Sequence, residues 1–362
     1  MHQFPSRPIR ALLLAGWTLV LTLTHSMAEN LRIGIIGLDT SHAEQFTLRL
    51  NDTANPNHVV GGRVVAAFPT PSPDIAESRD RVQGFTAAVR DKYGVRIASG
   101  IDEVCKEVDA ILLLTLDGRP RLAQMKQILA FGKPVFMDKP VASSLKDAVD
   151  IYKLAAAANV PVFSASAVRW YPGVLEVAGA EKEPASSAIS YGPAHIMEHH
   201  PDLFFYGIHP AESLFTVMGT GCVSVARSTS SSASIITGQW EGGRIGVLHA
   251  IHEGAKAYKV IRFGKERIVE QKSEGDYTPM LREIVKFFQT KQPPLTPRQT
   301  LEIYAFMEAA EESKRRGGKS ITLREVMTKA GAPEEWLPSD GKNVTLVPKP
   351  TEKKNLPPPG SE

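Results

Sequence analysis

The residue types that could do chemistry in this 362-residue sequence gather at two places. Lys139 follows a short apolar run and precedes Pro140, which fixes the local backbone and so aims the lysine side chain. His209 begins a predicted helix, and Glu212, three residues later, lies on the same helix face. Histidine titrates near neutral pH, and a lysine beside it can assist removal of a proton from a hydroxyl group. We therefore predict Lys139 and His209 as catalytic residues, with His209 as the general base.

Each of these residues also has a purely structural interpretation. Lys139 would then form a surface ion pair with Asp138, and His209 would be a core histidine satisfied by backbone groups. The catalytic hypothesis requires that the amine and the imidazole meet across one cleft. It fails if they lie on opposite sides of the protein.

A glycine-containing turn follows the first predicted strand and reads GLDTSH over residues 37–42. Dinucleotide-binding turns carry glycine at the first, third and sixth of these positions, next to a helix N-terminus that holds the pyrophosphate. Here Asp39 and His42 replace the second and third glycines, and a carboxylate would repel the pyrophosphate. Two alternatives stay open, a cofactor site or a tight turn with helix-capping residues. The candidate cofactor-binding residues in the turn are Gly37, Asp39, Thr40 and Ser41.

Polar residues also follow the apolar runs at residues 110–116 and 135–137. Because the carboxyl ends of parallel strands meet at one edge of a sheet, where ligands bind, these residues belong to the same candidate site. Arg119 and Arg121 follow the first of these runs. They either hold an anionic group of a ligand or are solvated residues at a helix start. The second strand, in contrast, is not followed by an acid for a ribose or a base for a 2′-phosphate. The further candidate cofactor-binding residues are Asp117, Asp138 and Lys139.

Two histidines and two acids stand close together in the run EHHPD over residues 198–202. Imidazole and carboxylate groups together suit zinc, iron or manganese. However, no recognised metal-ligand spacing is present, and adjacent histidines on a strand point to opposite faces. We assign no metal site, and the weak candidates are His199, His200 and Asp202.

These residues must be positioned by two kinds of architecture. Up to about residue 168, short apolar runs alternate with amphipathic stretches, which predicts an α/β fold with a doubly wound parallel sheet of the Rossmann type. From about residue 186 strands follow one another with glycine-rich turns, which predicts an α+β domain with a mostly antiparallel sheet. The predicted strands are 33–36, 64–68, 110–116, 135–137, 162–167, 223–228, 234–240, 244–251, 257–263 and 267–270, and the predicted helices are 75–93, 121–131, 145–158, 279–290 and 298–316.

The ends of the sequence differ from this pattern. Arg7 and Arg10, an apolar run over residues 11–24 and small residues before Glu29 are typical of a secretory signal peptide over residues 1–28. The run is shorter than the ~20 residues of a bilayer span, so the alternative of a membrane anchor is less favoured and no stable membrane span is expected after cleavage. We expect an exported protein, periplasmic or extracellular. The divisions are 29–168 Rossmann nucleotide-binding domain, 169–330 substrate and oligomerisation domain, and 338–362 disordered proline-rich tail.

The composition narrows the function classes. A hydrophobic content of 43% with 22% charged residues is ordinary for a soluble globular protein. The net charge of +3, which falls by two to +1 without Arg7 and Arg10, gives no basic field for nucleic acid. Cys105 and Cys222 fall in different predicted domains, so we expect two buried free thiols and no disulfide framework.

Three segments resemble the glucose-fructose oxidoreductase, inositol dehydrogenase and rhizopine catabolism (Gfo/Idh/MocA) family. They read IGIIG at 33–37, GKPVFMDKP at 132–140 and YGIHPAE at 206–212, and the likeness covers most of residues 31–323. The chain looks like a divergent member, since Phe205 stands where the family often has an aspartate and Arg121 where it has a histidine. The resemblance also implies Thr115 as a cofactor-binding residue, because it matches a threonine in a loop of the family. The substrate residues that the resemblance implies are Arg169, Tyr206 and Glu212.

The resemblance implies an NAD- or NADP-dependent oxidoreductase that acts on a sugar, polyol or related hydroxyl compound. By analogy it also implies a homo-oligomer formed through the C-terminal sheet. An exported member would have to retain its cofactor tightly. The alternative is a non-redox carbohydrate-binding protein, or a lyase or hydrolase, that kept the fold and lost dinucleotide binding.

Overall fold

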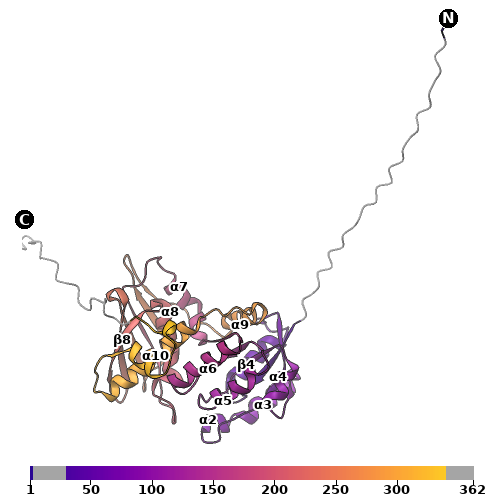
Figure 1. The fold of residues 1–362 in the computed structure, drawn as a ribbon, viewed down its shortest axis with the longest axis horizontal. Helices are drawn as coiled ribbons and strands as arrows, with labels where there is room; N and C mark the ends of the chain where they lie inside the picture. Colours follow the sequence, from indigo (N-terminus) through magenta and orange to yellow (C-terminus); the bar gives the residue numbers. More distant parts are fainter. Residues whose placement is uncertain (3–29, 340–362) are drawn as a thin grey trace, which may run out of the picture.

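The computed structural model describes residues 1–2 and 30–339 (Figure 1). The predicted signal peptide and proline-rich tail fall almost wholly outside these residues. Within them, no helix is long and apolar enough to cross a membrane. Cys105 and Cys222 are both buried and free, as expected.

The first sheet is parallel and six-stranded, in the order β3-β2-β1-β4-β5-β6. The strand order reverses between β1 and β4, so the carboxyl ends of these two strands frame the crevice where an open α/β sheet binds ligands. Buried apolar residues form a core on each side of the sheet, which confirms the predicted doubly wound fold. Its strands are β1 Leu31–Ile36, β2 Gly62–Phe68, β3 Arg96–Ile97, β4 Ala110–Leu113, β5 Val135–Met137 and β6 Val162–Ser164.

The helices of this part differ from the prediction in two respects. The helix predicted over residues 75–93 is divided into α2 and α3, and α4, which follows β3, was not predicted. The strand predicted over residues 110–116 ends at Leu113. Beyond it the Leu114 N–H still donates to the Ile36 carbonyl of β1, whereas the Leu116 N–H donates to the Asp39 carboxylate. The helices are α1 Ser41–Asn51, α2 Ala76–Arg79, α3 Val82–Tyr93, α4 Ile101–Glu107, α5 Arg121–Leu129 and α6 Leu145–Ala157.

The second sheet is seven-stranded, in the order β12-β11-β7-β10-β9-β8-β13. Its neighbouring strands are antiparallel except for β7 and β10, which run parallel. The predicted hairpin between β9 and β10 is present, with Gly242 and Gly243 both at positive φ. The strands are β7 Ser187–Pro193, β8 Cys222–Thr229, β9 Ala233–Trp240, β10 Ile245–Ile251, β11 Lys259–Phe263, β12 Ile268–Glu270 and β13 Ile321–Thr322.

One face of the second sheet is covered by helices, chiefly α8 and α10. Thr296 caps α10, and Pro297 lies at its first turn. The opposite face carries the partly exposed side chains Ile235 and Ile245. The remaining helices are η1 Ala167–Trp170, α7 Pro172–Ala178, η2 Leu203–Gly207, α8 Ile208–Met218, η3 Glu241–Gly243, α9 Thr278–Thr290, α10 Pro297–Arg315, α11 Leu323–Lys329 and η4 Glu334–Trp336.

Helix α9 returns from the second sheet to the first. Its buried residues Leu281 and Ile284 belong to the same apolar core as Ile35 of β1. The rings of Phe163 in β6 and Phe287 in α9 meet edge to face, with centroids 4.9 Å apart. A helix more than a hundred residues downstream in the sequence therefore helps to cover the parallel sheet.

Candidate active site

A pocket of about 200 Å³ lies between the carboxyl edge of the first sheet and the helices of the second part. Residues from both parts line it, so the fold alone brings them together. Among the predicted site residues, Thr40, Ser41, Asp138, Lys139, Tyr206 and His209 line the pocket. The other lining residues are His42, Arg81, Leu114, Leu116, Ala167, Val168, Tyr171, Phe205, Tyr258 and Tyr277.

Lys139 follows β5 and extends into this pocket from the first sheet. Its Nζ donates to the Phe205 carbonyl at 3.2 Å and lies 4.8 Å from the centroid of the Tyr206 ring. Burial lowers the pKa of Lys139 to about 8, against the opposing effect of the Asp138 carboxylate. The alternative of a surface ion pair with Asp138 is wrong, because the Asp138 carboxylate pairs with His42 and accepts only the backbone N–H of Lys139.

His209 enters the same pocket from the first turn of α8. Its Nδ1 lies 2.6 Å from Ser166 Oγ, and its ring meets Tyr258 edge to face at 5.6 Å between centroids. Burial, followed by the positive charge of Lys139, holds the pKa of His209 well below its ordinary value. A neutral imidazole and an amine therefore share one cleft, as the catalytic hypothesis requires.

The π-helix η2, which runs directly into α8, positions two aromatic residues beside the amine. Phe205 stands where the family often has an acid, and it contributes its carbonyl and its ring to the surroundings of Lys139. π-Helical turns are uncommon and are often found at functional sites. Tyr206 packs against both Lys139 and His209.

His42 also lines the pocket, although in the sequence it stands out only as the residue that replaces the third glycine of the turn. Its Nδ1 pairs with Oδ2 of Asp138, and its ring stacks on Phe46 and meets Tyr277 edge to face at 4.7 Å. Burial would raise the pKa of Asp138, but the hydrogen bond from His42 and the positive charges of Lys139 and Arg121 hold that pKa below its ordinary value. The signal in the sequence was a histidine in place of a fingerprint glycine, at a strand end where ligands bind.

The glycine of the turn is required by packing. Gly37 has φ +98°, and a Cβ on it would lie 2.4 Å from the backbone nitrogen of Thr115. Thr115 is itself buried, and its hydroxyl donates to Gln124. Thr40 caps α1 and, with Ser41, lines the pocket at the helix N-terminus. Of the predicted cofactor-binding residues in the turn, these last two face the cavity.

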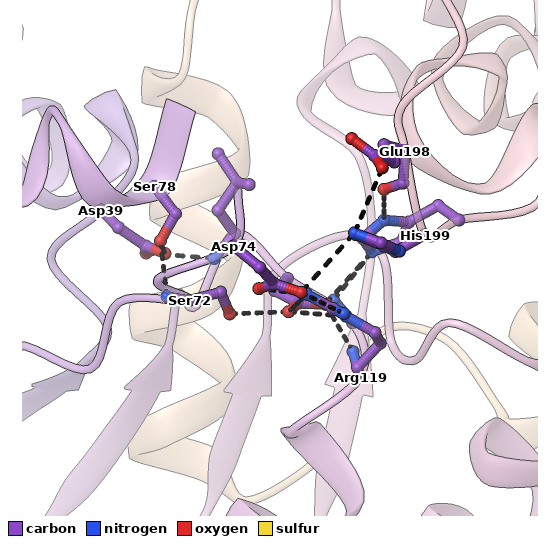
Figure 2. A network of polar contacts seen from close by, with 11 residues as sticks. Asp39, Ser72, Asp74, Ser78, Arg119, Glu198 and His199 are labelled. Atoms are coloured by element: carbon purple, nitrogen blue, oxygen red, sulfur yellow. Dashed lines mark hydrogen bonds and ion pairs between the residues drawn. The ribbon is translucent and has the colours of Figure 1, made fainter. Parts of the chain in front are cut away.

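A network of polar contacts joins the turn after β1 to the loop after β2 (Figure 2). Asp39 is fully buried, and its carboxylate accepts from Ser78 Oγ at 2.7 Å and from the Leu116 N–H at 3.1 Å. Burial raises the pKa of Asp39, and these hydrogen bonds oppose that shift. Asp39 thus ties α2 to the residues that follow β4.

The same network continues through Asp117 and Arg119. Asp117 is buried and accepts from Ser72 Oγ at 2.6 Å and from the Arg119 N–H at 2.8 Å. Burial would raise its pKa, but hydrogen bonds from His200, Arg119 and Ser72 hold it well below its ordinary value. Arg119 forms two parallel contacts with Asp74, at 2.7 and 2.8 Å.

This network affects how much of a dinucleotide the site can hold. The pocket lies at the N-terminus of α1, where Thr40 and Ser41 offer donors for a phosphate group of a dinucleotide. The rest of a dinucleotide would extend over the crevice between β1 and β4. Asp39 and Asp117, with their partners, bridge that crevice in this structure.

Several predicted residues do not reach the pocket. Arg121 is fully buried and donates to the carbonyls of Asp138 and Thr115, so it is neither an anion ligand nor a solvated residue. Arg169 and Glu212 pair with one another at 2.6 Å, and Glu212 also accepts from the Ser166 N–H. Both residues therefore support the segment that carries Ser166, the partner of His209.

The weak metal candidates do not converge. His199 lies 3.6 Å from Asp74, and His200 lies 3.3 Å from Asp117. Asp202 instead pairs with Arg227 and with a lysine of α10. Within the described part of the chain, no group of three or more histidine, cysteine or acidic side chains is arranged to hold a metal ion.

Comparisons with known proteins agree with this architecture. The family model "Oxidoreductase family, NAD-binding Rossmann fold" (GFO_IDH_MocA) matches residues 31–166, while no curated protein sequence matches. A putative myo-inositol dehydrogenase from Sinorhizobium meliloti is similar in structure, with a TM-score of 0.66 and 12% identity over 81% of this chain and 100% of that chain. A myo-inositol dehydrogenase from Lactobacillus casei, solved with NAD(H) and myo-inositol, has a TM-score of 0.65 and 13% identity over 81% and 96%.

At these identities the solved structures establish the fold, which comprises both sheets. The family match assigns the Rossmann part to an NAD-binding class, which supports NAD or NADP as the cofactor. The motifs at residues 33–37, 132–140 and 206–212 fall at β1, at β5 and at the start of α8, around one pocket. The Rossmann part of the chain, residues 31–166, therefore matches the Gfo/Idh/MocA family of NAD-binding oxidoreductases.

Proposed function

We propose that the protein is an NAD(P)-dependent oxidoreductase that acts on a hydroxyl group of a sugar, polyol or related compound. The observation that carries this proposal is the meeting of Lys139 and His209, from two separately built parts of the molecule, in one pocket. The ammonium group has one acceptor among the described residues, the Phe205 carbonyl, and so retains donors for a ligand oxygen.

The lining of the pocket favours a ring-shaped polar ligand. Four tyrosines line the pocket. A tyrosine combines a flat apolar ring with a hydroxyl group, which suits a compound with apolar faces and polar edges. The solved relatives include proteins named for myo-inositol, and one bound to L-tartaric acid, which extends the class to small hydroxy acids. The tyrosines of the lining are Tyr171, Tyr206, Tyr258 and Tyr277.

The chain's own residues divide the work between binding and proton transfer. Thr40 and Ser41 would hold the cofactor at the N-terminus of α1, and the cofactor when bound supplies a hydride acceptor. Lys139 and His209 would hold the oxygen of the reacting hydroxyl. The aromatic residues around them exclude water and strengthen these contacts.

We also propose, from the leader sequence, that the protein is exported and works in the periplasm or outside the cell. Such a protein would have to keep its cofactor through the catalytic cycle. The experiment is to purify the mature protein and identify any bound nicotinamide by mass spectrometry. Oxidation of myo-inositol, related polyols and L-tartrate is then followed by the absorbance of the reduced cofactor.

Lys139→Met and His209→Asn should each lower kcat about 10²- to 10⁴-fold without loss of the folded state. Lys146→Met, at an exposed lysine of α6, is the matched control and should leave turnover unchanged. Full activity in both pocket variants would refute the assignment of the site.

The polar contacts that bridge the crevice between β1 and β4 favour a second candidate, a non-redox carbohydrate-binding protein or a lyase or hydrolase. Asp39 and Asp117 occupy positions over which a dinucleotide would extend. This second candidate predicts that the purified protein contains no nicotinamide and binds neither NAD nor NADP on addition, yet still binds one of the carbohydrates.

A further inference from the structure

His42 and Asp138 form a carboxylate–imidazole pair that the function proposed above does not use. Asp138 is 3% exposed and His42 is 8% exposed, so the pair is shielded from water. The two residues are 96 positions apart in the sequence, and the parallel sheet brings them together at its carboxyl edge. Phe46 and Tyr277 pack on the imidazole and restrict its rotation.

The pair determines which nitrogen of His42 is free. An ionised carboxylate can only accept hydrogen bonds, so Nδ1 of His42 is the donor to Asp138. The second nitrogen, Nε2, then carries the lone pair, and it is the one left for a ligand in the pocket that His42 lines. This is the arrangement in which an acid orients an imidazole base and stabilises its protonated form.

His209 is less suited to hold a proton. Its Nδ1 partner is the neutral hydroxyl of Ser166, and the ammonium group of Lys139 acts on the same imidazole as a like charge. A proton on His209 would therefore gain no carboxylate and would face a positive neighbour. A proton on His42 would sit beside a buried negative charge.

We infer that His42 is a further catalytic residue, the general base of the site, and that Asp138 is its positioning residue. The O–H bond of the substrate breaks, a new N–H bond forms at Nε2, and the electron pair of the broken bond stays on the substrate oxygen. Lys139 and His209 hold that oxygen. This inference rests on the proposed function for the reaction, while the state of the imidazole can be tested without it.

The first experiment measures the imidazole directly. Diethyl pyrocarbonate modifies a histidine nitrogen that carries a free lone pair, and mass spectrometry maps the modified residue. In the wild-type protein His42 should be labelled at neutral pH. In Asp138→Asn, whose amide can donate to Nδ1 and so move the proton to Nε2, labelling should be at least tenfold slower. No labelling of His42, or equal rates in both proteins, would overturn the inference.

The second experiment measures turnover with the polyol oxidised fastest by the wild-type protein. His42→Gln should lower kcat at least 10²-fold and change KM less than threefold. Glu44→Gln, on the same helix but bonded to Lys92 outside the pocket, is the matched control. If His42→Gln is active and His209→Gln is inactive, the general base is His209 and the inference is wrong.

The two experiments separate the two proposals. If no hydroxyl compound is oxidised, the proposed function fails, and the labelling rates still decide whether the pair exists as described. If Asp138→Asn does not fold, comparison of wild type with His42→Gln identifies the labelled site, and the kcat of His42→Gln decides the role.

Discussion

Lys139 is an ammonium group placed among aromatic rings at the edge of a sheet. The Phe205 carbonyl and the face of Tyr206 replace part of the water that it loses. Burial nevertheless dominates, and its pKa falls to about 8. Burial of the charged ammonium group therefore lowers the free energy of unfolding, a cost that a purely structural residue would not need. Stability measurements can detect this cost.

Lys139→Met should raise the free energy of unfolding by about 1–3 kcal/mol at pH 7. Between pH 8 and the ordinary lysine value of about 10.4, the unfolded chain binds more protons than the folded one, so wild-type stability rises with pH. The gain of the variant is therefore complete below pH 8 and disappears toward about pH 10.4. Urea titrations across this range measure it, with Lys146→Met as the control. A gain that is equal at all pH values would contradict the burial of the ammonium group.

The turn between β1 and α1 shows what the sequence could and could not predict. The apolar run of β1, the glycine and the helix start were predictable from local pattern. The pairing of His42 with Asp138 was not, because it depends on the register of strands that are far apart in the sequence. The break between α2 and α3 was also missed, and the bond from Ser78 of α2 to Asp39 is a second contact that local pattern does not reveal.

Gly37→Ala should destabilise the protein by about 2–4 kcal/mol, because a Cβ would meet the Thr115 backbone and φ is positive. Gly84 of α3 is the matched control, since a Cβ there meets nothing within 4 Å and its φ is helical. Gly84→Ala should stabilise by about 0.5–1 kcal/mol. Chemical denaturation of both variants checks the contrast, and equal effects would refute the packing explanation.

Asp39→Gly should strengthen NAD binding at least tenfold, because it removes both the bulk and the negative charge from the crevice between β1 and β4. Asp39→Asn keeps the bulk and removes the charge, so its affinity should lie between the two. Titration calorimetry on protein stripped of any bound nucleotide measures both. An unchanged affinity in Asp39→Gly would mean that the network does not obstruct the dinucleotide.

At the scale of the molecule, the fold class and the order of elements followed from periodicity and turn residues. The way the two parts pack together could not be predicted, because no local sequence pattern reveals that α9 covers the first sheet. The face of the second sheet opposite to α8 and α10 carries Ile235 and Ile245, which are 38% and 44% exposed among the described residues and lie on adjacent strands. We propose that a second copy of the chain covers this face in a homo-oligomer.

Replacing Ile235 and Ile245 together by glutamate should convert the oligomer to a monomer, because a buried charge on each strand cannot be paired. Light scattering coupled to size-exclusion chromatography measures the mass. Val60→Glu is the control, at a residue that is 76% exposed in the loop before β2 of the other sheet. A wild-type monomer would refute the proposal.

The return of α9 to the first sheet has a consequence for how the chain is made. When the ribosome has finished β6, one side of the parallel sheet still lacks the apolar residues Met280, Leu281 and Ile284. The nascent chain therefore has to wait for more than a hundred further residues before that side is sealed. Until then the incomplete sheet exposes an apolar surface. A chaperone would bind there, and a chain released too early would aggregate through it.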